Sequence, residues 1–100
     1  MYLLDQHKES IADLCRKHKV QRLSVFGSVL SEHFSEQSDI DFLVQFDTIE
    51  LSEYANNYYE FKFSLQQLLQ RPVDVIEDQA VRNPFLRQSI QSRQQLLYAA

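Results

Sequence analysis

The sequence contains a single glycine, Gly27, and glycine is the one residue type that adopts a positive φ without steric cost. A domain of 100 residues usually holds about seven glycines, so this chain has kept one at a particular place. Gly27 follows a hydrophobic run, residues 23–26, and precedes Ser28. Glycine is the default residue where φ must be positive or where a ligand approaches the main chain closely. The sequence therefore predicts a strand that ends, at Gly27, in a turn that tolerates no side chain.

A pair of aspartates, Asp39 and Asp41, follows Ser28 after ten intervening residues. They open a predicted strand over residues 39–46, in which alternate side chains point to opposite faces. One face is apolar, and the other begins with the two carboxylates. A shorter predicted strand, residues 73–76, repeats this pattern with Asp74 between two valines. If the two strands are neighbours in one sheet, the three carboxylates project from the same face.

These three carboxylates predict a metal site. Like charges ~4 Å apart repel by about 4 kcal/mol at an effective dielectric constant of 20, so the cluster has to be protonated, solvated or neutralised by a cation. Mg²⁺ binds carboxylates, water and substrate phosphates, and a pair of such ions holds the attacking and leaving oxygens of a phosphoryl transfer. We therefore expect two Mg²⁺ ions, with metal ligands and catalytic residues at Asp39, Asp41 and Asp74. The backbone at Gly27 and the hydroxyl of Ser28 then suit the phosphates of a nucleoside triphosphate.

Helices fill most of the remaining pattern, after a first strand over residues 20–26. Apolar residues at helical spacing predict helices over residues 5–18 and 51–70, and a short helix is expected over residues 29–34. A last helix is expected to begin at Asn83, a good N-cap that is followed by proline. One side of this last helix is expected to carry Leu86, Ile90, Arg93 and Leu97.

Several side chains on these predicted helices leave two interpretations open. Lys62 lies in the apolar stripe of residues 51–70, so either its stem packs on the core while its ammonium reaches solvent, or the ammonium binds the phosphates of the nucleotide. Tyr59 and Phe63 form a second apolar strip, which suits a partner or subunit interface as well as extra core contact. The single cysteine, Cys15, is expected to be a buried small hydrophobe.

Composition limits the classes of partner. The net charge is −4, and no Lys or Arg occurs between Arg22 and Lys62, which argues against strong nucleic-acid binding because such proteins are usually basic. No run approaches the roughly 18 apolar residues of a membrane span, and the first residues lack the order of a signal peptide. We therefore expect a cytoplasmic protein, one domain over residues 1–100, without membrane contact. A homo-oligomer is compatible with the sequence.

The order Gly27-Ser28, ten residues, Asp39-Ile-Asp41 and a later Val-Asp74-Val resembles the minimal nucleotidyltransferases of the DNA polymerase β superfamily. Residues 82–90 and the closing Leu-Leu-Tyr also look like the C-terminus of that family, so the resemblance spans nearly the whole chain. It implies an α/β (α+β) domain whose small mixed sheet of about three strands is backed by helices, with Mg²⁺-dependent transfer of a nucleoside monophosphate from ATP or another nucleoside triphosphate. By transfer residue by residue, Gly27 and Ser28 contact the triphosphate. Asp39 and Asp41 bind the metals, and Asp74 completes the second metal site and assists the acceptor hydroxyl as a base.

The resemblance also implies a partner. Many such proteins are encoded beside a helical HEPN-domain protein, and the pair resembles a toxin-antitoxin system in which the nucleotidyltransferase is the antitoxin and, in some cases, adenylylates a tyrosine of its partner. Transfer of AMP from ATP to a HEPN-domain protein is therefore the implied reaction. An alternative is a non-catalytic antitoxin that binds its partner through Tyr59 and Phe63. Transfer to RNA or a small molecule is disfavoured, because a chain of this length leaves no second domain to hold the acceptor.

One departure from the family pattern concerns the loop after Ser28. Many members place an arginine and another glycine there, whereas residues 29–33 of this chain contain neither. A cationic phosphate contact is therefore missing from the loop. His33, Lys62 or an arginine of the C-terminal segment or of a partner would have to replace it.

Overall fold

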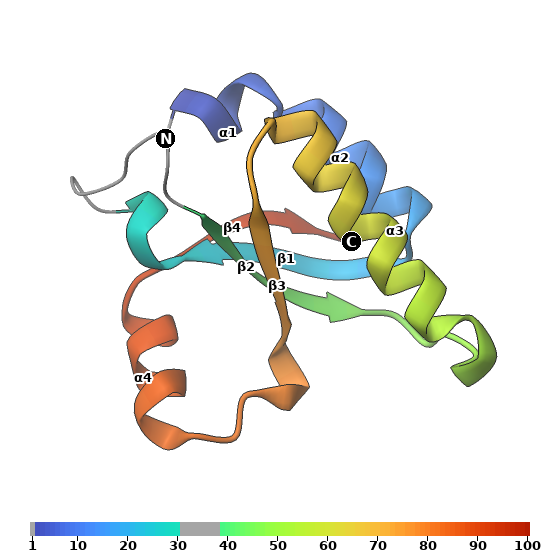
Figure 1. Cartoon of the computed structure of the whole chain (residues 1–100). Helices are drawn as coiled ribbons and strands as arrows, with labels where there is room; N and C mark the ends of the chain where they lie inside the picture. The colour runs from blue at the N-terminus through green and yellow to red at the C-terminus, as the bar shows by residue number, and fades with distance from the viewer. Residues whose placement is uncertain (1, 31–38) are drawn as a thin grey trace.

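In the part of the chain that the structure describes, four strands form one mixed β-sheet in the order β3-β2-β1-β4 (Figure 1). The computed structural model describes residues 2–30 and 39–100. β1 (Val20–Phe26) runs antiparallel to both β2 (Ile40–Phe46) and β4 (Gln94–Ala99), whereas β2 and β3 (Val73–Glu77) are parallel. The expected mixed sheet is confirmed, with one strand more than the three that were expected.

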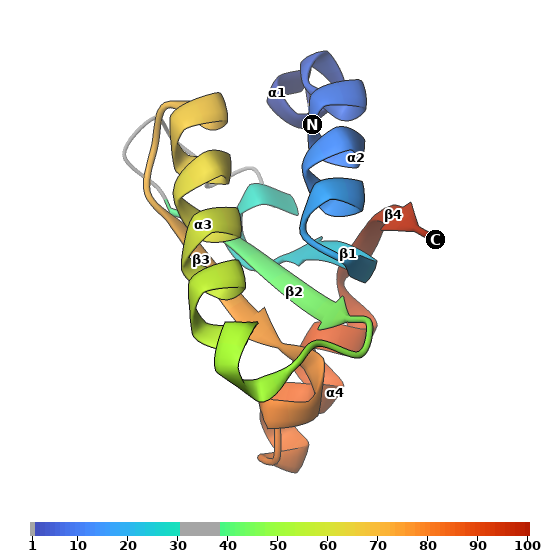
Figure 2. The same cartoon turned by 90° about the vertical axis from the view of Figure 1, so that its right-hand side faces the viewer.

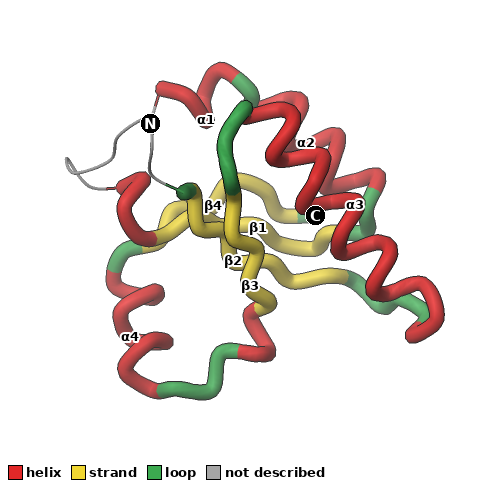
Figure 3. The backbone as a smooth tube through the Cα atoms, in the orientation of Figure 1, coloured by secondary structure: helices red, strands yellow, loops and turns green. Residues whose placement is uncertain are grey.

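The described helices divide between the two faces of the sheet (Figure 1, Figure 2). One face is covered by α1 (Tyr2–Gln6), α2 (Lys8–Lys17) and α3 (Leu51–Leu69), and α4 (Pro84–Ser92) lies on the other. Short 3₁₀ helices, η1 (Gly27–Leu30) and η2 (Asp78–Ala80), directly follow β1 and β3 (Figure 3).

Alternation along β2 sends its side chains into two separate cores. Ile40, Phe42 and Val44 are fully buried in the larger core, whose other members include residues of α2 and α3. On the opposite face Leu43 packs against a smaller cluster made by Phe26, Val81 and Ile90. We call this second face, which carries Asp41, Leu43 and Gln45, the open face.

The helix ends follow the local chemistry that the sequence indicates. Gln70 adopts a left-handed conformation with φ 55°, and Arg71-Pro72 stops α3 because proline disfavours the helical conformation at the residue before it. Asn83 caps α4 as predicted, since its side-chain oxygen accepts hydrogen bonds from the amides of Phe85 at 2.9 Å and Leu86 at 3.3 Å. The helix predicted over residues 5–18 is interrupted at His7, which separates α1 from α2.

The predicted end of the last helix is wrong. α4 stops at Ser92, and the residues that follow form β4, so Leu97 lies on a strand instead of on a helical stripe. The apolar spacing through residues 86–97 is helical, but β1 has an unpaired edge that residues 94–99 fill by antiparallel pairing. A non-local ladder of hydrogen bonds therefore overrides a local pattern. Of the short helix predicted over residues 29–34, residues 29 and 30 belong to η1, and residues 31–34 lie outside the described part of the chain.

Cys15 of α2 is buried as expected, and so is His18, which follows the helix. Cys15 is fully buried, and burial raises the pKa of its thiol to about 12. His18 is buried too, with its Nδ1 donating a hydrogen bond to the Leu14 carbonyl oxygen at 2.9 Å. Among the helices in residues 2–30 and 39–100, none is long and apolar enough to cross a membrane.

Candidate functional site

The parallel pairing of β2 with β3 places two of the predicted aspartates side by side. Asp41 and Asp74 are direct partners in the register of the two strands, and Phe26 of β1 is the partner of Asp41 on its other side. Neighbouring strands lie about 4.8 Å apart, and residues in direct register point to the same face. Since the flanking Ile40 and Phe42 point into the larger core, both carboxylates project from the open face.

Asp41 responds electrostatically to both other aspartates. Its pKa is raised, first by partial burial, then by the negative charge of Asp74, and then by that of Asp39. Burial and like charges both disfavour the ionised form. Asp39 stands directly before β2 and is exposed, as is Asp74. The negative charges of Asp74 and Asp39 therefore both act to raise the pKa of Asp41, the most buried of the three aspartates.

Gly27 is required here for two separate reasons. Its φ is +79°, a conformation that residues with a side chain rarely adopt. In addition, a Cβ built on Gly27 would stand 2.6 Å from Oδ2 of Asp41. The side chain that a Cβ would displace is thus the aspartate itself. The predicted turn without a side chain is confirmed, and its partner is a carboxylate of the site.

The other two predicted phosphate ligands have different outcomes. Ser28 follows Gly27 in η1, but its side chain lies outside the described part of the structure, as does all of His33. Lys62 is half-buried on α3, the helix that packs against the face opposite to Asp41. The structure therefore brings together Gly27, Asp41 and Asp74 but not Lys62, and phosphate binding by Lys62 stays a prediction.

The carboxylates suit a metal that arrives with its ligand. In residues 2–30 and 39–100, no three His, Cys, Asp or Glu side chains are grouped as a complete metal cage. Mg²⁺ does not need one, because it keeps several waters and is usually bound by one or two carboxylates together with substrate phosphates. Asp41 and Asp74 supply these hard oxygen donors. The donor set fits Mg²⁺ bound with a phosphate compound and does not fit a permanently held structural metal.

Tyr58 of α3 holds β3 in place through its hydroxyl group. The sequence does not predict this role, because Tyr58 is there only one member of a helical stripe of apolar residues. Its hydroxyl donates a hydrogen bond to the carbonyl oxygen of Val75, the residue after Asp74. The pKa of Tyr58 is raised by burial and then by nearby groups that include Asp74. This bond ties α3 to an edge strand that β2 holds on one side only. Only a structure reveals it, because a hydroxyl in an apolar stripe carries no sign of its partner.

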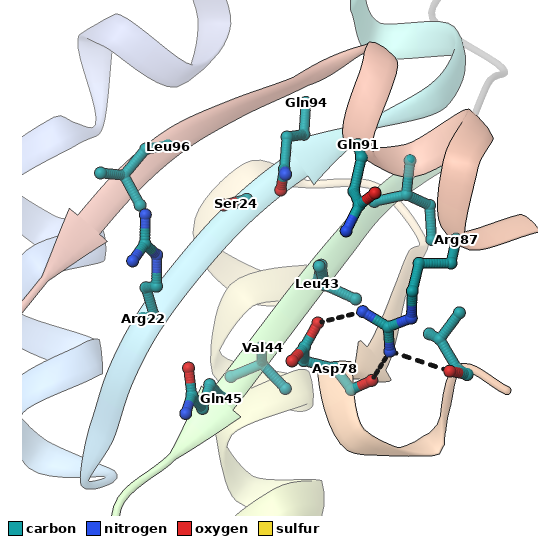
Figure 4. A pocket seen from close by; sticks show the side chains of 12 residues that line it. Arg22, Ser24, Leu43, Val44, Gln45, Asp78, Arg87, Gln91, Gln94 and Leu96 are labelled. Atoms are coloured by element: carbon teal, nitrogen blue, oxygen red, sulfur yellow. Dashed lines mark hydrogen bonds and ion pairs between the residues drawn. The ribbon is translucent and has the colours of Figure 1, made fainter. Parts of the chain in front are cut away.

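A pocket of about 430 Å³ lies on the open face between the sheet, α4 and β4 (Figure 4). Arg87 of α4 closes one side of it, with hydrogen bonds to the carbonyl oxygens of Asp78 and Val81, both at 2.8 Å, and an ion pair to the Asp78 carboxylate at 3.4 Å. The sequence did not predict this pocket, because it forms only when α4 folds back over the sheet.

On α3, which covers the face of the sheet opposite to the open face, Tyr59 and Phe63 are 54% and 57% exposed. We call that face the helical face. Their rings lie 6.5 Å apart on successive turns of α3. The interpretation that they add core contact is therefore wrong, and the interface interpretation stays a prediction.

The sequence and the fold both match known proteins. The family model of the nucleotidyltransferase domain matches residues 7–97. Two relatives from Methanocaldococcus jannaschii, both named as candidate protein adenylyltransferases, are 33% and 34% identical over 89 residues, which is 89% of this chain and 85% of each relative.

Solved structures extend the match to the arrangement of the elements. A structure described as a candidate minimal nucleotidyltransferase has a TM-score of 0.76 and 29% identity, covering 92% of this chain and 90% of its own. A toxin-antitoxin structure with AMP-PNP has a TM-score of 0.71 at 24% identity, covering 93% and 73%. A complex of a tri-AMPylated Shewanella oneidensis HEPN toxin with an MNT antitoxin has a TM-score of 0.66 at 22% identity, covering 96% and 72%. At such low identities the last two matches show a shared fold.

Proposed function

This chain belongs to the nucleotidyltransferase domain family, and from that premise we propose that it transfers AMP from ATP to a hydroxyl group of a protein partner. The observation that carries the proposal is the direct register of Asp41 with Asp74 beside the positive-φ Gly27. Two carboxylates on adjacent strands and a turn without a side chain provide, within one small area, oxygen donors for a metal and main chain that a phosphate can approach. The relatives named as candidate protein adenylyltransferases support a protein as the acceptor.

In the proposed reaction, the acceptor oxygen attacks the α-phosphorus of ATP and forms a new P–O bond. The bond from the α-phosphorus to the bridging oxygen breaks, and pyrophosphate leaves. Asp74, the exposed carboxylate of the pair, accepts the proton of the attacking hydroxyl. Mg²⁺, for which Asp41 and Asp74 would supply carboxylate oxygens and Asp39 is the further proposed ligand, would neutralise phosphate charge during the transfer.

The triphosphate is proposed to lie along the turn that leaves β1. Gly27 exposes its backbone there, and Ser28 supplies the hydroxyl, so the pair binds the outer phosphates. Because a Cβ on Gly27 would stand 2.6 Å from Oδ2 of Asp41, the proposed phosphate and metal halves of the site lie side by side. A change in the turn is therefore felt directly by the metal ligand.

The proposed partner is a HEPN-domain protein, with this chain as the antitoxin of the pair. Support comes from the shared fold with chains of two toxin-antitoxin structures, one solved with AMP-PNP and one with a tri-AMPylated HEPN toxin. A non-catalytic antitoxin is the second candidate. It is favoured by the exposed Tyr59 and Phe63 on α3 and by the absence of a cation from residues 29–32.

Incubation of the chain with a HEPN-domain partner, Mg²⁺ and ATP labelled at the α-phosphate tests the proposal. Label is expected on the partner with the wild-type chain, and none with the Asp41→Asn, Asp74→Asn double variant. Asp47→Asn is the matched control, because Asp47 follows the far end of β2, is exposed, and binds the Thr48 amide through its own side chain. If the wild type leaves the partner unlabelled and the double variant still neutralises it, the binding-only antitoxin is the correct function.

A further inference from the structure

The pocket under α4 (Figure 4) lies on the same face of the sheet as Asp41 and is not used by the reaction described above. Along the open face, the first row across β2 and β1 is Asp41 with Phe26, and the next row is Leu43 with Ser24. Two residues along a strand span about 6.7 Å. Leu43 and Ser24 form the floor of the pocket, so its floor starts one row from the metal ligand.

The pocket is lined by aliphatic side chains and by carboxamide groups that both donate and accept hydrogen bonds. Leu43, Ile90 and Leu96 provide apolar surface, and the carboxamides come from Gln45, Gln91 and Gln94. Each carboxamide offers one acceptor oxygen and two N–H donors. Glutamine pairs with the N6 and N7 edge of adenine through one donor and one acceptor. The carboxamides therefore suit the polar edge of a purine base, and the apolar side chains suit its faces.

Two arginines line the pocket, Arg22 on β1 and Arg87 on α4. Arg87 is committed to Asp78 and to the Val81 carbonyl oxygen, and Ile90 is buried against Phe26. The guanidinium therefore fixes α4 as a roof instead of binding an anion. Its volume of about 430 Å³ lies within the range of small-molecule sites, about 300–1,000 Å³.

We propose that this pocket binds the base of the nucleotide, and that its carboxamides select adenine. The inference rests on the proposed function, because the α-phosphate must lie at Asp41 for the base to lie one row further along the strands. The ribose then bridges the two rows, and Gln91 and Gln94, at the end of α4 and the start of β4, face the base edge.

Isothermal titration with ATP and with inorganic tripolyphosphate, both with Mg²⁺, separates base recognition from phosphate binding. The test variants are the Gln91→Ala, Gln94→Ala pair and Leu96→Trp, which fills the pocket. All three residues are exposed enough to be changed without removing core. Gln95→Ala is the matched control, because Gln95 lies on the same strand but lines a pocket beside α1 and α2.

For the wild type we expect tighter binding of ATP than of tripolyphosphate and of GTP. Both test variants should weaken ATP binding about tenfold or more, and leave tripolyphosphate binding unchanged, while Gln95→Ala changes neither. ATP affinity that survives both variants would overturn the base pocket alone. If the wild type binds neither ATP nor tripolyphosphate, the proposed function fails along with it.

Chemical-shift mapping with adenosine, which has no phosphates, gives an independent readout. The amides of Leu43, Gln91 and Gln94 are expected to shift, whereas those of Gln95 and its neighbours on the helical face are not. Shifts confined to the region of Gly27, or no shifts at millimolar adenosine, would contradict the assignment of the pocket.

Discussion

Replacing Gly27 with alanine should damage the site far more than the fold. The backbone cost arises because alanine at φ +79° is strained, by about 1–2 kcal/mol for a left-handed conformation. For a domain of this size each kcal/mol lowers Tm by about 4–8 °C. The new Cβ would also stand 2.6 Å from Oδ2 of Asp41, so the carboxylate has to move away by nearly an ångström. Displacements of that size in an active site can cost about 100-fold in rate.

A double-mutant cycle separates these two effects. Gly27→Ala is made in the wild type and in Asp41→Ala, and the free energy of unfolding is measured by urea denaturation. In the Asp41→Ala background the oxygen that meets the new Cβ is absent, and only the backbone strain remains. The cost of Gly27→Ala should be smaller there, with a coupling of about 0.5 kcal/mol or more, as for residues in contact.

Equal costs in both backgrounds would show that the contact between Gly27 and Asp41 has no energetic consequence. Wild-type AMP transfer by a Gly27→Ala protein would refute the argument that the turn and the metal ligand are coupled.

Three further predictions concern charge, capping and burial. Asp41→Asn should stabilise the metal-free protein at pH 7, because the raised pKa of Asp41 means that its ionisation disfavours the folded state. The gain in free energy of unfolding over the wild type is measured by urea denaturation in EDTA. It should vanish below about pH 4, where the carboxyl of the wild type is protonated in both the folded and the unfolded state. A gain that persists unchanged at acid pH would contradict this. Asn83→Ala should cost about 1 kcal/mol, since it removes the acceptor for the amides of Phe85 and Leu86 at the start of α4; a cost near zero would show that the cap is not formed in solution. Cys15 should react with a thiol reagent only after unfolding, as it is fully buried with a pKa of about 12, and rapid reaction of the native protein would contradict its position in the core.

The open face could be predicted from the sequence because it depends on simple periodicity. Alternation in residues 39–46 separates Asp41 from Ile40 and Phe42, and the repeat of this pattern around Asp74 suggests neighbouring strands. What periodicity cannot supply is the register, which depends on how α3 returns the chain to the sheet. The structure adds that the register is direct, Asp41 opposite Asp74.

The strand at residues 94–99 and the pocket could not be predicted from the sequence, because both depend on contacts between residues that are remote in the chain. Residues 94–99 contain no proline or glycine to mark the change from helix to strand, and the strand is stabilised by pairing with β1, which is remote in sequence. The pocket likewise depends on Arg87, which holds α4 to the loop after β3 through backbone carbonyl oxygens. Every residue has a backbone carbonyl oxygen, so the residue types in the sequence do not indicate which carbonyl oxygens Arg87 binds.

We propose above all that the aspartate pair catalyses AMP transfer to a protein partner. Intact-mass spectrometry of a HEPN-domain partner after co-expression with the chain tests it most directly, with the Asp41→Asn, Asp74→Asn variant alongside. We predict a partner that carries covalent AMP only with the wild-type chain, located on a hydroxyl side chain by peptide sequencing. An unmodified partner that co-purifies with the wild-type chain and is neutralised by it would contradict the claim.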